Sequence, residues 1–335
     1  MNINKAKEVL LAAAKAKVEG RFHGGIMLWG PPGVGKSSVV AQVAEELGLP
    51  LIDVRLSTLS VVDVRGLPYI DKERGISKFA KPFFVPDAPA VLFLDEVNTA
   101  PPANQVVAYE IALDNRVGGH PLPEGTVVIM AGNRAEDRGA THTMPVPLRN
   151  RLLHITIEPD VDATYEYGLK NGWKSEVLAF LKWRPELLFQ PPKGNQEAFP
   201  SPRSWEYVNN ILDYTDSFEA ISGLIGEGPA AEFLAYRKLV SQLPDLDAIL
   251  AGKQPPYENG DISVMYAYVV GLVSRARSMK PTQTLAKNFV KALEKTPTEL
   301  LPVAVLGVTG TPLASQLVSL ADWRKLLSSI GQAIR

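Results

Sequence analysis

One segment, Gly30-Pro-Pro-Gly-Val-Gly-Lys36-Ser37, constrains the fold of this 335-residue chain more than any other. It has the pattern GxxxxGK[ST] and directly follows the apolar run Ile26–Trp29. The glycines let the backbone curl closely around phosphate, and successive N–H groups then form an anion site at the start of a helix. Lys36 should reach the β- and γ-phosphates, and Ser37 should bring its hydroxyl to Mg²⁺. The pattern predicts a nucleoside triphosphate site made by Gly30, Pro31, Pro32, Gly33, Val34, Gly35, Lys36, Ser37 and Ser38.

Two carboxylates end a second apolar run, Val91–Asp95 with the following Glu96. Asp95 stands where a Walker B aspartate holds Mg²⁺, usually through water. Glu96 is placed to orient and deprotonate an attacking water. A glutamate in that place favours hydrolysis of the nucleotide over binding alone, so we expect an ATPase.

Four further polar residues are candidates for the same site. Asn133 follows the apolar run Thr126–Gly132 and can hold the attacking water or the γ-phosphate. Arg149 and Arg151 precede the next apolar run; such arginines are often surface charges, but phosphoryl transfer needs positive charge that a neighbouring molecule can supply. Arg203 opens a helical segment in the second half, from which it could reach back to the nucleotide.

The pattern of the chain changes near Asp160. Before it, short β-rich runs alternate with helical segments, which is typical of a parallel sheet covered by helices on both faces. The runs are Ile26–Trp29, Leu51–Val54, Val91–Asp95, Thr126–Gly132 and Leu152–Ile157. Residues 62–86 contain several glycines and prolines and should form an inserted loop or hairpin. After Asp160, helical periodicity broken by Pro- and Gly-rich joints, such as Gly226–Pro229 and 190–195, predicts an all-helical second half.

Composition excludes several other classes of protein. The chain has no cysteine, which excludes disulfides, zinc–cysteine sites, iron–sulfur clusters and thiol catalysis. Its four histidines, His23, His120, His142 and His154, lack metal-ligand spacing. The formal charge of −1 argues against broad binding to duplex DNA. The amino-terminal segment is typical of an amphipathic helix, and no apolar run is long enough to span a bilayer, so we expect a soluble, cytoplasmic protein.

Taken together, the motifs resemble those of the AAA+ ATPases, and most of all the MoxR-like and midasin-like branch, the dynein-related type of AAA domain. LDEVNTAPPANQ is similar to that branch's LDEINRAPP segment, and GGHPLPEGTVVIMAGN to its stretch leading into sensor 1. PVPLRNRL resembles the midasin-type finger segment, and SPRSW resembles the sensor-2 entry of the lid. LSVVDVRGLP, residues 59–68, looks like the loop before the branch's insert. Thr99 departs from the pattern, which often has arginine there.

The resemblance covers about residues 5–212 and implies a fold and a role for each matching residue. It implies a P-loop NTPase (AAA+) core, an α/β domain with a parallel five-stranded sheet over residues 1–158. An all-α lid would follow over residues 159–228, and a helical C-terminal extension over 229–335. The implied roles are Walker A for Lys36 and Ser37, Walker B for Asp95 and Glu96, sensor 1 for Asn133, trans arginine finger for Arg151 with Arg149 as neighbour or substitute, and sensor 2 for Arg203.

The resemblance further implies a homo-oligomeric ring, with a hexamer expected, that uses ATP and Mg²⁺. Hydrolysis would move the loops of residues 62–86 and 116–124 and so remodel a protein partner. Members of the branch often act with a protein that has a von Willebrand factor A (VWA) domain. Two alternatives stay open: a nucleic-acid-acting motor in a restriction or defence assembly, using the basic residues within 72–81, and a nucleotide-gated scaffold. Glu96 argues against the scaffold, which has little use for a catalytic base.

Overall fold

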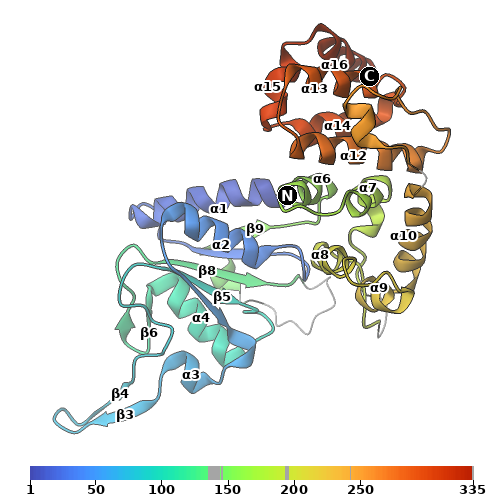
Figure 1. The fold of residues 1–335 in the computed structure, drawn as a ribbon. Coiled ribbons are helices and arrows are strands. Elements are labelled where there is room, and N and C mark those ends of the chain that lie inside the picture. Colours follow the sequence, from blue (N-terminus) through green and yellow to red (C-terminus); the bar gives the residue numbers. More distant parts are fainter. Residues whose placement is uncertain (135–143, 145, 193–195, 242, 334–335) are drawn as a thin grey trace. The chain divides into compact units, whose positions relative to one another are not determined.

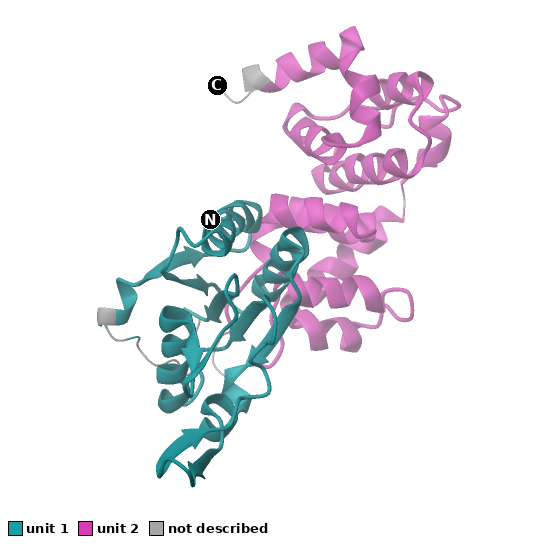
Figure 2. Cartoon of the chain, turned by 90° about the vertical axis from the view of Figure 1, so that its left-hand side faces the viewer, with its two compact units in different colours: residues 1–159 teal, residues 160–335 magenta. Residues whose placement is uncertain are grey.

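The computed structural model describes residues 1–134, 144, 146–192, 196–241 and 243–333, so His142 and part of the predicted joint at 190–195 lie outside the described residues. The chain forms two compact units, Met1–Pro159 and Asp160–Arg335, which Figure 2 colours separately. The finer division of the second half at residue 228 stays a prediction.

A five-stranded parallel sheet forms the centre of the first unit, as the sequence predicts. The strands lie in the order β2 (Leu51–Arg55), β5 (Val91–Asp95), β8 (Val127–Gly132), β1 (Gly25–Trp29) and β9 (Leu152–Thr156). The register pairs Trp29 with Gly132 and with Thr156, and Arg55 with Asp95. Because every pair is parallel, the carboxyl ends of the strands meet at one edge of the sheet, the edge at which α/β proteins bind their ligands.

Helices cover both faces of this sheet, which explains why its central strands are apolar on both sides. These helices are α1 (Ile3–Val18), α2 (Lys36–Leu47), the 3₁₀ turn η1 (Leu56–Thr58), α3 (Val61–Arg65), α4 (Pro102–Asp114) and α5 (Val146–Arg149). α1 and α2 share a core cluster with Ile26 and Leu28, whereas α3 and α4 share one with Met27. Alternate residues of β1 therefore face opposite helical layers (Figure 1).

Residues 62–86 contain a hairpin, one of the two forms predicted for this insert. β3 (Pro68–Asp71) and β4 (Ile76–Phe79) pair antiparallel and project from the sheet (Figure 1). Gly66 turns the chain into the hairpin with a φ of +97°, and a Cβ there would lie 2.0 Å from the carbonyl oxygen of Ala80. Only glycine fits this turn, because any side chain would collide with the returning strand.

A shorter hairpin follows α4 and contacts the first one. It consists of β6 (Arg116–Val117) and β7 (His120–Pro121). The Nε2 atom of His120 lies 2.7 Å from the carbonyl oxygen of Phe79 in β4. This hydrogen bond joins the segments 62–86 and 116–124, the two that the resemblance implies move during hydrolysis.

The second unit is helical, as predicted. Its helices are α6 (Val161–Lys170), α7 (Ser175–Trp183), η3 (Pro185–Leu187), α8 (Pro202–Ile211), α9 (Phe218–Ile225), α10 (Glu227–Val240), α11 (Leu246–Leu250), α12 (Ile262–Ser278), α13 (Gln283–Ala292), η4 (Thr298–Leu300), α14 (Leu301–Val308), α15 (Pro312–Val318) and α16 (Ala321–Ala333). In its core, the ring of Phe180 lies 5.2 to 5.5 Å from the rings of Trp205, Phe233 and Tyr236. Within the described part of the chain, no helix has both the length and the apolar composition that a membrane crossing requires.

Two helices of this unit, α8 and α10, have a proline in their first turn. Pro202 is the first residue of α8, and Ser201 caps it by accepting a hydrogen bond from the Ser204 N–H. α10 begins at Glu227, so the predicted joint Gly226–Pro229 was wrong in extent. Pro229 lies in the first turn of the helix, where backbone N–H groups have no partner within the helix and a missing N–H costs little.

Candidate active site

The predicted phosphate loop joins β1 to α2 at the carboxyl edge of the sheet. Gly33 and Gly35 have φ of +77° and +97°, the left-handed region that favours glycine. Gly30 is required by packing, since a Cβ there would lie 2.6 Å from the carbonyl oxygen of Ile157. The loop runs directly into the amino end of α2, where unpaired backbone N–H groups and the helix dipole favour an anion.

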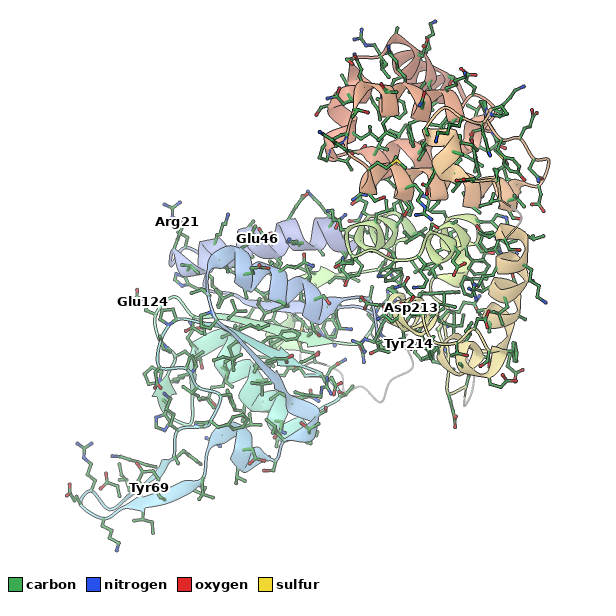
Figure 3. All side chains as sticks on the ribbon, in the orientation of Figure 1. Arg21, Glu46, Tyr69, Glu124, Asp213 and Tyr214 are labelled. Atoms are coloured by element: carbon green, nitrogen blue, oxygen red, sulfur yellow. The ribbon has the colours of Figure 1, made fainter. Side chains whose placement is uncertain are left out.

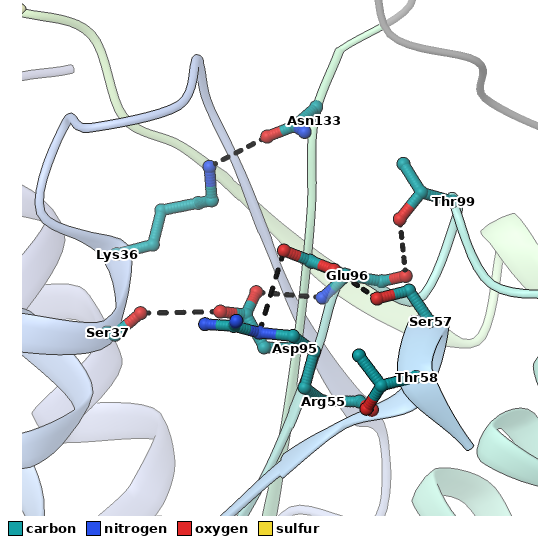
Figure 4. A network of polar contacts seen from close by, with 9 residues as sticks. All are labelled: Lys36, Ser37, Arg55, Ser57, Thr58, Asp95, Glu96, Thr99 and Asn133. Atoms are coloured by element: carbon teal, nitrogen blue, oxygen red, sulfur yellow. Dashed lines mark hydrogen bonds and ion pairs between the residues drawn. The ribbon is translucent and has the colours of Figure 1, made fainter.

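Lys36 is buried at the head of this loop, with only 9% of its surface exposed. Its ammonium donates to the carbonyl oxygens of Gly30 and Pro31 at 2.7 and 3.1 Å, and to Oδ1 of Asn133 at 3.1 Å (Figure 4). An ammonium is a strong donor to phosphate oxygens, and the loop that carries Lys36 also presents backbone N–H groups to an anion. The surroundings of Lys36 therefore fit a phosphate, and they bring Asn133 to the same place.

Two oxygen-bearing side chains, Ser37 and Asp95, provide a place for Mg²⁺ beside the loop. The Ser37 hydroxyl donates to Oδ2 of Asp95 at 3.4 Å. Burial raises the pKa of Asp53, the charge of Asp95 raises it further, and Arg55 opposes the shift. Asp53 lies in the middle of β2, opposite Phe93, so it adds negative charge near Asp95 without standing at the strand end itself. Hydroxyl and carboxylate oxygens, such as those of Ser37 and Asp95, are the ligands Mg²⁺ prefers. The residues present fit the predicted metal site of Ser37 and Asp95.

Glu96 has an unusual backbone and two side-chain partners. Its φ is +57°, a left-handed value that is uncommon for a residue with a side chain. Oε2 accepts a hydrogen bond from the Ser57 hydroxyl, and Oε1 lies 3.6 Å from Nε of Arg55 (Figure 4). The Glu96 carbonyl oxygen accepts from the Thr99 hydroxyl at 3.0 Å, so Thr99 stabilises this turn. Both partners hold the Glu96 carboxylate in place, and the Ser57 hydroxyl occupies one of the lone-pair sites at which the attacking water could bind.

Ser57→Ala tests this restraint on Glu96. We expect basal kcat for ATP hydrolysis to rise about fivefold, because the hydrogen bond that competes with water is worth about 1 kcal/mol. Steady-state ATPase assays measure the change, and Ser60→Ala, on the same loop but bonded to Asp63, is the matched control. A fall in kcat would mean that Ser57 helps Glu96 rather than restrains it.

Asn98 is a site residue that the sequence analysis missed. Its amide Nδ2 donates to the Asn133 carbonyl oxygen at 2.6 Å, and its Oδ1 accepts from the Asn133 N–H at 3.1 Å. A Cβ on Gly132 would lie 2.4 Å from Oδ1 of Asn98, so a side chain there would displace the Asn98 amide. Asn98 thereby fixes the backbone of Asn133 opposite Lys36. The signal in the sequence was a polar residue two positions after Glu96, within the segment LDEVNTAPPANQ.

Asn98→Ala should harm both stability and catalysis. The substitution leaves the Asn133 N–H and carbonyl without their partner in a part-buried position, which we expect to lower the free energy of unfolding by about 1–3 kcal/mol. Displacement of Asn133 should lower kcat by about tenfold. Urea denaturation and ATPase assays on the same preparation separate the two effects. An unchanged kcat in the folded variant would remove Asn133 from the site.

The two candidate finger arginines lie at the other edge of the sheet. Arg151 directly precedes β9, and its carbonyl oxygen accepts from the Gly25 N–H at the start of β1. The phosphate loop follows the opposite end of β1, so a five-residue strand, roughly 16 Å, separates the two. Arg149 ends α5, and its Nε donates to the Met144 carbonyl oxygen at 2.9 Å. Both arginines are exposed, and Arg151 lines an open groove of about 640 Å³.

Arg203 belongs to the second unit, where it is exposed in the first turn of α8. The sequence predicts that it reaches the nucleotide as sensor 2, and that role stays a prediction. The first unit alone brings together Lys36, Ser37, Asp95, Glu96 and Asn133, the larger part of the predicted site.

The fold and the site together define a P-loop ATPase. More specifically, residues 26–156 match the model of the family described as "ATPase family associated with various cellular activities (AAA)". The matched segment runs from β1 to the end of β9 and contains every candidate residue except Arg203. The first unit is therefore an ATPase domain of the AAA family, and its cofactors are ATP and Mg²⁺.

Individual relatives match only parts of the chain. The replication factor C large subunit of Aeropyrum pernix is 32% identical over 115 residues, which are 34% of this chain and 22% of that protein. The ATP-dependent zinc metalloprotease FtsH 2 of Phytoplasma mali is 31% identical over 147 residues, 41% of this chain and 20% of that protein. The chain thus covers about a fifth of each relative. A mutant RuvB structure from Thermotoga maritima aligns over 81% of this chain and 83% of its own, with 15% identity and a TM-score of 0.42.

Proposed function

We propose that this chain is the subunit of an ATP-hydrolysing ring, with a hexamer expected, that remodels or activates a protein partner in the manner of the MoxR-like branch. The observation that carries the proposal is the position of Arg151 at the edge of the sheet opposite the phosphate loop. An arginine there cannot reach its own loop along the strand, so it completes a site in another copy. In a ring, each copy gives an arginine to one neighbour and receives one from the other.

Within each site, residues of this chain divide the work of hydrolysis. The loop N–H groups and Lys36 bind the β- and γ-phosphates, and Ser37 with Asp95 holds Mg²⁺. Mg²⁺, when bound, neutralises charge on the phosphate oxygens. Glu96 accepts a proton from the attacking water, and Asn133 orients that water. Two of these contacts, Lys36 with Asn133 and Ser37 with Asp95, are already formed in the structure and support the assignment.

The hairpin of the first unit favours a protein partner over nucleic acid. Tyr69 and Ile70 are neighbours in β3, so they lie on opposite faces of the strand, and they are 49% and 71% exposed. Figure 3 labels Tyr69 on the projecting hairpin. Apolar side chains on a projecting ribbon suit contact with a protein surface. Of the basic residues within 72–81, Lys78 and Lys81 are each paired with an aspartate. These pairs reduce the positive charge that a nucleic-acid motor would need on the hairpin.

The proposal also includes a partner protein with a VWA domain. It further includes a location in the cytoplasm, where ATP is supplied. Both are supported by the likeness of LDEVNTAPPANQ and PVPLRNRL to MoxR-like motifs. The nucleic-acid motor and the nucleotide-gated scaffold are the alternatives against which the proposal is tested.

The ATPase rate per subunit, measured over about a thousandfold range of protein concentration, tests the ring. We expect the rate to rise steeply and then level off, because a shared site forms only on association. Analytical ultracentrifugation of the same samples should show an oligomer appearing over the same range. A rate per subunit that does not depend on concentration would contradict the shared site.

The partner class is tested on the assembled protein. Stimulation of hydrolysis by a VWA-domain protein supports the proposal. Stimulation by nucleic acid that weakens steeply with salt supports the motor alternative instead. ATP binding that drives assembly without turnover supports the scaffold.

A further inference from the structure

Two rings connect the strand before the phosphate loop to the candidate finger. Trp29 is the last residue of β1, and His154 lies in the middle of β9. The Trp29 indole N–H donates to Nδ1 of His154 at 2.8 Å, with the ring planes 13° apart. The other imidazole nitrogen, Nε2, lies 2.9 Å from the carbonyl oxygen of Arg149. His154 thus bridges Trp29 and Arg149.

The two hydrogen bonds determine the protonation of this imidazole. An indole N–H can only donate, so Nδ1 of His154 is the acceptor and has no hydrogen. A carbonyl oxygen can only accept, so Nε2 bears the hydrogen and donates it to Arg149. Both nitrogens of the ring are in use, and its orientation is fixed from both sides.

Each end of the bridge belongs to a segment of the proposed function. Trp29 directly precedes the phosphate loop. Arg149 and Arg151 belong to one turn, because the Arg151 N–H donates to the Leu148 carbonyl oxygen at 3.0 Å. The bridge therefore joins the loop that binds a subunit's own nucleotide to the turn whose arginine serves another copy.

The position of His154 argues against a role in packing alone. It is exposed on β9, an edge strand, where a β-branched residue would suit the strand equally well. Its register partner on β1 is Met27, and the imidazole reaches diagonally past that residue to Trp29. What histidine offers here, and valine does not, is an acceptor on one side and a donor on the other.

We propose that His154, supported by Trp29, is a positioning residue for the arginine that this chain gives to a neighbouring copy. The inference rests on the proposed function, because it concerns an arginine that acts between copies. The Nε2–H bond holds the Arg149–Arg151 turn in place, and the Trp29 bond ties that turn to the subunit's own loop. A displacement of about 1 Å in a catalytic group can cost roughly 10²-fold in rate. Loss of the bridge therefore slows hydrolysis in the neighbour and leaves the subunit's own site intact.

Mixed assemblies separate the subunit that gives the arginine from the one that receives it. The donor carries Lys36→Ala, so it binds no ATP but keeps its arginines. The acceptor carries Arg151→Ala, so it keeps its nucleotide site but gives no arginine. Each alone should be inactive, and the mixture should regain ATPase activity. If this pair, in which His154 is still present in both partners, stays inactive when mixed, the site is not shared between copies. The proposed function is then wrong as well.

With an active pair in hand, His154→Val is placed in one partner at a time. In the donor it should lower kcat of the mixture by about tenfold, with KM for ATP unchanged because the acceptor's loop is untouched. In the acceptor it should change nothing, since that subunit lacks Arg151, the arginine to be positioned. Normal activity in this arm also shows that the His154→Val variant folds. His154→Gln in the donor, which returns a side-chain N–H near the Nε2 position, should recover most of the rate. Equal losses in both arms, or no loss in the donor, overturn the proposal.

Trp29→Phe tests the other half of the bridge. In the donor it should lower kcat in the same direction as His154→Val, because phenylalanine fills the space of the indole without its N–H. The double variant should then be no slower than the slower single one, since both substitutions break the same connection. Additive losses would mean that Trp29 and His154 act separately, which overturns the bridge.

Discussion

Arg151→Ala is expected to lower the ATPase rate of the assembled protein by about 10³-fold while ATP affinity stays unchanged. An arginine finger compensates the charge of the transferring phosphoryl group, so its loss affects the transition state far more than the bound nucleotide. Arg151 lies at the edge of the sheet opposite Lys36, so its removal leaves the phosphate loop of the same subunit intact. ATPase assays at saturating protein concentration, with fluorescent-nucleotide titration of the same variant, measure the two quantities separately.

Arg149→Ala is the matched control for this variant. It removes the same charge from the same turn, but Nε of Arg149 is already bonded to the Met144 carbonyl oxygen. We therefore expect a smaller loss of rate than for Arg151→Ala. The opposite ranking would assign the finger to Arg149, and full activity in both variants would refute an arginine shared between copies.

The core of the fold and the nucleotide-binding residues could be predicted because their signals are local. A strand buried on both faces is apolar along its whole length, as Val91–Leu94 is, and needs no knowledge of its neighbours. The phosphate loop is equally local, since its glycines, Lys36 and Ser37 lie within one short segment. In the sheet, β5 and β1 both pair parallel with β8, and this brings Asp95 at the end of β5 to Ser37 after β1.

The partners of Glu96 and Asn133 could not be predicted, because they come from distant parts of the chain. Ser57 and Asn98 are ordinary polar residues in the sequence, and only the packing of η1 and of the turn after β5 brings them to the site. The prediction that the Gly226–Pro229 joint extends to Pro229 was wrong for another reason. A proline is compatible with both a joint and the first turn of a helix, and the sequence alone did not separate the two.

Glu96→Gln should lower kcat by about 10³-fold with ATP binding retained, since a positioned general base contributes roughly 10²–10⁴-fold. Glutamine has the shape of glutamate and can still accept a hydrogen bond from Ser57, but it cannot take a proton from water. The exposed pair with Arg55 is lost, and such pairs contribute little to stability, so the variant should fold. Single-turnover hydrolysis and a nucleotide-binding titration together measure the effect.

The Glu96→Gln variant also determines whether Ser57 acts through this carboxylate. If the rise in kcat expected for Ser57→Ala comes from freeing Glu96, it should vanish when residue 96 cannot act as a base. The double variant Ser57→Ala with Glu96→Gln should then be as slow as Glu96→Gln alone, a strong departure from additivity between residues in contact. A double variant that is faster than Glu96→Gln alone would show that Ser57 restrains some other part of the site. Near-normal turnover in Glu96→Gln itself would place the base elsewhere, with Asp53, whose pKa is raised by burial beside Asp95, as the next carboxylate to test.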